Sequence, residues 1–131
     1  MENTFKKQER LCGRIEIGRL LAKGRHGSVD GLRYCYLSGS GRDCNRILVS
    51  VPKKLFRHAV RRNYLKRLIR EAYRTQKALL PVTGTDLMFI YATQEILSAA
   101  EVRRRVADIL QETSHRIGTA EQPSATNADA L

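Results

Sequence analysis

Four basic residues recur at every fourth position in the middle of the chain, at Arg62, Lys66, Arg70 and Arg74. Residues four apart lie on nearly the same side of a helix, so this spacing predicts one continuous cationic stripe. Asn63 falls inside the stripe, where its amide can hydrogen-bond a base or a phosphate. Guanidinium groups bind phosphates bidentately and ammonium groups bind them as point charges. The pattern therefore predicts a helix that binds a polyanion.

The charge of the whole chain points the same way. The 131 residues include 24 Lys and Arg against 13 Asp and Glu, which gives a formal charge of +11. Between residues 53 and 74, nine basic residues accompany one acid, Glu71. A solvated helix face usually mixes signs so that charges pair along the helix, and this one does not. A nucleic acid is the first candidate partner, and an anionic membrane surface is the second.

The residues that could do chemistry without such a partner are scattered. A stand-alone nuclease would need clustered acidic metal ligands or an acid–base pair. The acids do not cluster in the sequence, and His26, His58 and His115 have no evident partners. The glycine-rich residues 38–43 are not followed by the Gly-Lys-Ser/Thr of a phosphate-binding loop. We expect no catalytic side chain and no protein-bound metal.

Length and composition indicate one domain in a reducing compartment. A chain of 131 residues with 42% apolar residues can bury a single core. No 18-residue apolar run is present, and the N-terminus lacks the apolar stretch of a signal peptide. The three cysteines, Cys12, Cys35 and Cys44, form no C-x-x-C pair and suit free thiols. We expect a cytoplasmic protein that does not bind membranes.

The periodicities predict a mixed α/β (α+β) sandwich in the order α-β-β-α-β-α. Helices are expected at residues 11–21, at 55–79, and after the capping box that Ser98 and Glu101 form. Strands are expected at residues 32–37, 46–51 and 86–92, and a loop at 24–31. Tyr64 is assigned to the apolar face of the second helix. Residues 1–10 are expected to form a flexible basic arm, 11–117 the domain, and 118–131 a disordered tail.

Two linked segments resemble the signature of the bacterial ribonuclease P protein subunit. They are Val49-Ser50-Val51-Pro52-Lys53-Lys54 and the basic run from Ala59 to Tyr73. The resemblance extends over roughly residues 5–115. It implies a small sandwich whose strands on either side of the basic helix are parallel. It also implies a left-handed βαβ crossover, as in the second domain of ribosomal protein S5, although such crossovers are right-handed in about 98% of cases.

The resemblance also implies a function and two binding surfaces. The family assists a catalytic RNA in removing the 5′ leader of precursor tRNA, and Mg²⁺ ions held by that RNA carry the chemistry. The protein would bind ribonuclease P RNA and precursor tRNA as a monomer in the complex. The residues implied in leader binding are Leu11, Ile15, Tyr36, Ser50, Arg62, Asn63, Lys66 and Arg70. Those implied in binding the catalytic RNA are Lys53, Lys54, Arg61, Arg67 and Arg74.

This sequence departs from the family pattern in the leader cleft and in the basic helix. Leu11 and Ile15 stand where the family usually has aromatic residues, so base stacking there should be weaker. Tyr64 replaces the second arginine of an Arg-Asn-Arg motif, and Pro52 replaces a common serine. The alternative to the ribonuclease P assignment is a ribosomal-protein-like RNA-binding module without a role in cleavage. A DNA-reading regulator is disfavoured because a strand, not a short helix, precedes the basic helix.

Overall fold

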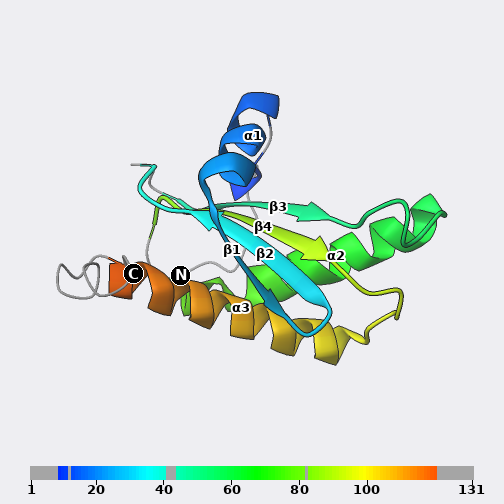
Figure 1. Cartoon of the computed structure of the whole chain (residues 1–131). Coiled ribbons are helices and arrows are strands. Elements are labelled where there is room, and N and C mark those ends of the chain that lie inside the picture. The colour runs from blue at the N-terminus through cyan, green and yellow to red at the C-terminus, as the bar shows by residue number, and fades with distance from the viewer. Residues whose placement is uncertain (1–8, 12, 41–43, 82, 121–131) are drawn as a thin grey trace.

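Three α-helices pack against the two faces of one small sheet (Figure 1). The computed structural model describes residues 9–11, 13–40, 44–81 and 83–120. Its elements are α1 (Arg14–Lys23), β1 (Arg25–Val29), β2 (Leu32–Leu37), β3 (Arg46–Ser50), α2 (Ala59–Gln76), the 3-10 helix η2 (Lys77–Leu79), β4 (Asp86–Tyr91) and α3 (Ala99–Ala120).

The sheet has the strand order β1-β2-β4-β3 and mixes antiparallel with parallel pairing. β1 pairs with β2 and β2 pairs with β4, both antiparallel. β3 and β4 are parallel and are joined through α2, because parallel neighbours need a crossover connection. The predicted fold class and the predicted parallel strands around the basic helix are confirmed. The handedness of the crossover stays a prediction.

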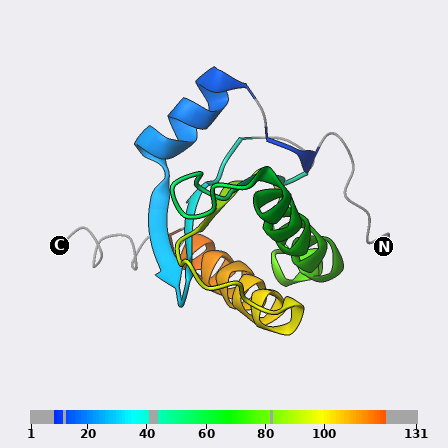
Figure 2. The same ribbon diagram turned by 90° about the vertical axis from the view of Figure 1, so that its right-hand side faces the viewer.

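The main core lies between the sheet and the pair α2 and α3 (Figure 2). α2 contributes Leu65, Ile69 and Tyr73, and alternate residues of the strands meet them. The predicted capping box forms at the start of α3, where the backbone N–H of Glu101 donates to Ser98 Oγ and that of Ser98 donates to Glu101 Oε1. The core contacts of Leu65, Ile69 and Tyr73 fix α2 in place, so the side of α2 that faces away from the core is left for solvent or a partner.

A second, smaller core lies on the opposite face of the sheet under α1. Leu11, Leu20 and Cys35 are each at most 2% exposed there. Burial raises the pKa of the Cys35 thiol, whose Sγ lies 3.2 Å from the carbonyl oxygen of Leu20. Leu11 is predicted on the first helix, but it precedes α1 and bonds to β3 through its backbone N–H and the Ile47 carbonyl, at 2.8 Å.

Two predictions about the strands and arm need correction. The predicted loop at residues 24–31 contains β1, in which Val29 is the one apolar side chain, so no apolar alternation marks the strand in the sequence. Within the predicted flexible arm, Glu9 is 6% exposed and its carboxylate accepts from Lys77 Nζ at 3.0 Å. Residues 1–8 of that arm lie outside the described residues.

The predicted helix boundaries also shift. The basic helix starts at Ala59 rather than near residue 55, because the backbone N–H groups of Leu55 and Phe56 turn back to the Pro52 carbonyl. α3 continues past Gly118 to Ala120, so residues 118–120 are helical and do not belong to the predicted disordered tail. Residues 121–131 lie outside the described part of the chain.

Alkaline pH should destabilise the fold through Tyr34. Burial and the hydrogen bond to Glu112 raise the pKa of this phenol to about 12. The unfolded chain ionises it near the ordinary tyrosine pKa of about 10, so the stabilisation present below pH 10 is lost as pH rises through 12. Urea unfolding at about pH 9 and about pH 11 should show a smaller loss for Tyr34→Phe than for the wild type. An unchanged pH dependence in the variant would assign the loss to other groups.

Candidate nucleic-acid interface

Positive charge gathers where the chain turns from β3 into α2. Lys53, Lys54 and Arg57 are exposed in this turn, and Arg61 is exposed in the first turn of the helix. The structure describes that first turn in full; it contains no acid, and the His58 side chain at the N-cap makes no capping hydrogen bond. A helix N-terminus carries a partial positive charge of its own. We call these four exposed residues, together with the exposed Arg67 nearly two turns further along the helix, the basic end of α2.

Arg62 has a structural position rather than an exposed one. Its Nη1 donates to the carbonyl oxygens of Phe56 and Arg57, both at 2.9 Å. It lies on the same side of α2 as the buried Leu65 and Ile69, so its guanidinium turns back along the helix start. The predicted stripe is therefore interrupted at its first member, and Arg62 instead holds the turn that presents Lys53 and Lys54.

The next two members of the stripe, Lys66 and Arg70, lie half-buried and exposed, respectively. Burial and the nearby positive charge of Arg10 lower the pKa of Arg70. Arg10 forms an isolated bridge to Ile47 of β3, which brings it to the same side of the molecule. Together the two arginines add positive charge to this side of the molecule. No pattern in the sequence points to Arg10, because only the chain's course beside β3 places it there.

The last member of the stripe, Arg74, forms an ion pair with Glu71 on its own helix. Its Nε lies 3.1 Å from Glu71 Oε1, and its Nη2 also pairs with that carboxylate. The pKa of Glu71 is lowered by this contact and that of Arg74 is raised. Arg74 thus offers less charge to an RNA than Arg67, which is exposed on the same helix. Asn63 is exposed as well.

The residues predicted to line a leader cleft divide between the two faces of the sheet. Ile15 is 80% exposed on α1, and Ser50 is half-buried at the end of β3 on the face that α1 covers. Tyr36 is only 3% exposed and packs in the main core on the opposite face, with the Arg116 guanidinium 5.2 Å from its ring centre. Leu11 is 2% exposed. In this conformation neither Tyr36 nor Leu11 presents its side chain to a strand lying beside Ile15 and Ser50.

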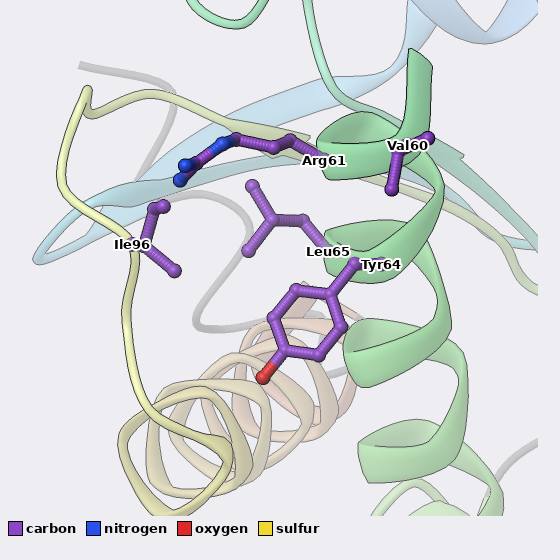
Figure 3. A pocket seen from close by; sticks show the side chains of 5 residues that line it. All are labelled: Val60, Arg61, Tyr64, Leu65 and Ile96. Carbon is purple, nitrogen blue, oxygen red and sulfur yellow. The ribbon is translucent and has the colours of Figure 1, made fainter. Parts of the chain in front are cut away.

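Tyr64 is predicted to dock on the sheet and does not. Its side chain is 46% exposed and forms one wall of a cavity with Val60, Arg61, Leu65 and Ile96 (Figure 3). The buried face of α2 is centred on Leu65, Ile69 and Tyr73 instead. Sequence reasoning missed this cavity, because Ile96 comes from the loop between β4 and α3.

Neither a metal cluster nor a membrane span is found among the described residues. No three His, Cys, Asp or Glu side chains gather there as a metal ion would require. In the same part of the chain, no helix combines the length and the apolar character needed to cross a bilayer.

The comparison with known proteins identifies the family. A family model described as Ribonuclease P matches residues 5–114. The chain belongs to the ribonuclease P protein family. A ribonuclease P protein component from Petrotoga mobilis is 41% identical over 87 residues, which cover 66% of this chain and 71% of the relative. The one from Porphyromonas gingivalis is 49% identical over 76 residues, covering 56% of each, so the match spans little more than half of that relative.

Solved structures of the family have the same architecture. The ribonuclease P protein from Thermotoga maritima superposes with a TM-score of 0.70 at 26% identity, covering 79% of this chain and 96% of that one. A Staphylococcus aureus ribonuclease P protein gives a TM-score of 0.69 at 23% identity, covering 80% of this chain and 94% of that chain. At 23% identity, the likeness to the Staphylococcus aureus protein concerns the fold alone.

Proposed function

We propose that this chain is the protein subunit of ribonuclease P, and that a single copy binds the catalytic RNA and the 5′ leader of precursor tRNA. The observation that carries the proposal is the basic end of α2, which is exposed on a member of the ribonuclease P family. Lys53, Lys54, Arg61 and Arg67 bind phosphates of the catalytic RNA. Mg²⁺ ions held by the RNA carry the hydrolysis, and the protein positions substrate and RNA.

The leader follows the side of the molecule where α1, the end of β3 and the flank of α2 that carries Lys66 and Arg70 are accessible. Ile15 and Ser50 meet bases, while Lys66, Arg70 and Asn63 contact the backbone. A basic flank beside apolar contacts suits a single strand. Arg10, which bridges to Ile47 of β3 and whose charge lowers the pKa of Arg70, is added to this surface.

Reconstitution tests the function directly. Adding the protein to the ribonuclease P RNA of the same organism at low Mg²⁺ should restore removal of the 5′ leader from a precursor tRNA. A pull-down of the protein from cells should recover ribonuclease P RNA. Recovery of ribosomal RNA instead, with no stimulation of cleavage, would favour a ribosomal-protein-like module and contradict the proposal.

The leader surface makes a separate prediction. Lys66→Ala with Arg70→Ala should weaken holoenzyme binding of precursor tRNA by about 10-fold near physiological salt, because two phosphate contacts are lost. Binding of mature tRNA, which has no leader, should stay within about twofold. Arg25→Ala with Arg104→Ala, which removes two exposed cations outside this surface, serves as the control. Equal losses for both substrates would contradict the leader assignment.

A further inference from the structure

Three large apolar side chains are held in solvent at the start of α2 and beside it. Val60 is 80% exposed, and Tyr64 and Ile96 are each 46% exposed. With Leu65 and the stem of Arg61 they line an open cavity of about 400 Å³ between the first two turns of α2 and the loop before α3 (Figure 3). Arg61 is the only charged residue among the described residues that line it. The cavity thus combines an aromatic wall, aliphatic walls and a cationic rim.

The Ile96 wall is fixed in place. The Tyr91 hydroxyl donates to the Glu95 carbonyl and accepts from the Leu97 N–H at 3.0 Å, so the residues on both sides of Ile96 are tied to one buried side chain. The start of this loop is also tied, because the Ala92 N–H donates to the Gly31 carbonyl at 3.0 Å. The exposure of Ile96 is therefore imposed by the fold. A wall that needs no ordering on binding costs the ligand less free energy.

We propose that this cavity, called the Tyr64 pocket from here on, binds one unpaired nucleobase of the catalytic RNA. The inference rests on the proposed function. Unpaired bases in RNA stack on tyrosine rings and on guanidinium planes, and the Tyr64 pocket offers a ring with Arg61 at its rim. Lys53, Lys54 and Arg57, which precede the same helix end, suit the phosphates on either side of that base. A site for a basic peptide would require an acidic side chain, and the described residues that line the pocket include none.

The position of the pocket on α2 indicates whether the base comes from the catalytic RNA or from the leader of precursor tRNA. Val60, Arg61 and Tyr64 lie on the flank of α2 that faces the loop before α3. Lys66 and Arg70 lie on the other flank, where the positive charge of Arg10 lowers the pKa of Arg70. A leader strand held along Lys66 and Arg70 does not also reach the Tyr64 pocket around the helix. The base therefore belongs to the catalytic RNA.

Three substitutions at Tyr64 separate stacking from other contacts. Binding of full-length ribonuclease P RNA to the complete protein should weaken about 10-fold for Tyr64→Ala and Tyr64→Leu, whereas Tyr64→Phe should stay within about twofold of wild type. The slope of log K against log salt should not change, because stacking releases no counterions. Leu21→Ala, which truncates a similarly exposed apolar residue on α1, should bind like wild type. Chemical probing should show a nucleotide that wild type protects and Tyr64→Ala does not.

The other outcomes contradict the proposal in distinguishable ways. If wild type binds the RNA and Tyr64→Ala binds equally well, the pocket is not used and the proposed function stands. If Tyr64→Leu binds like wild type, the contact is merely apolar, as with a protein chain. If binding falls only for leader-bearing precursor tRNA and not for the catalytic RNA, the assigned source is wrong. If wild type does not bind the RNA, the proposed function fails together with the inference.

Discussion

Asp86→Ala should destabilise the protein by about 3–5 kcal/mol, the loss typical when one partner of a buried ion pair is removed. Asp86 begins β4 and Arg46 begins the parallel neighbour β3. Arg46 Nε and Nη2 donate to the two carboxylate oxygens of Asp86 at 2.9 and 2.8 Å, with side chains 11% and 10% exposed. Glu16 of α1 also pairs with Arg46. The substitution would leave a buried guanidinium with half of its partners.

Urea unfolding followed by circular dichroism measures this loss. Glu71→Ala is the matched control, because it breaks the exposed pair with Arg74 on α2, and an exposed pair contributes far less to stability than a buried one. Similar losses for both variants would mean that the Arg46–Asp86 pair contributes no more than a surface pair. Because a stability loss near 3–5 kcal/mol is a large part of a typical domain's total, the assay should be run at low temperature.

The basic helix and the central strands could be predicted because each has a pattern of its own. Residues 86–91 are nearly all apolar, which is typical of a strand covered on both sides, and β4 has that position. The sequence did not predict β1, because an edge strand that is half in solvent needs no alternation of apolar residues. The turn Asp30-Gly31 was the available signal, since Asp-Gly between two extended segments is typical of a hairpin.

The faces of the sheet could not be assigned from the sequence. In β2, Tyr34, Cys35 and Tyr36 are all buried, because helices cover both faces there. Alternation shows that Tyr36 and Cys35 point in opposite directions, but not which of them points toward α1. The resemblance groups Tyr36 with Ser50 in one cleft, and the structure places them on opposite faces of the sheet.

The cationic stripe shows a different limit. Spacing on a helix predicts which residues share a side, and it does not predict where each guanidinium turns. Arg62 reaches back to two carbonyl oxygens and Arg74 pairs with Glu71, so two of the four charges have partners within the protein. Most of the exposed positive charge of this region lies at the basic end of α2, where the turn at residues 52–58 brings Lys53, Lys54 and Arg57 to the helix start.

Removing that charge should have the largest effect on RNA binding. The quadruple variant Lys53→Ala, Lys54→Ala, Arg61→Ala and Arg67→Ala should bind the catalytic RNA about 100-fold to 1,000-fold more weakly near physiological salt. Each phosphate contact contributes about 0.7–0.9 to the slope of log K against log salt, so the slope should become shallower by about 3. Filter binding over a range of salt concentrations measures both quantities.

A second quadruple variant separates location from total charge. Lys23, Arg25, Arg33 and Arg104 are exposed outside the basic end of α2, and replacing them with alanine removes the same four charges. If the basic end of α2 is the interface, this variant should keep most of the affinity and nearly the wild-type slope, because long-range attraction alone is screened within about 10 Å at 0.1 M salt. Equal losses in the two variants would show that the RNA responds to net charge, and that α2 provides no defined set of phosphate contacts.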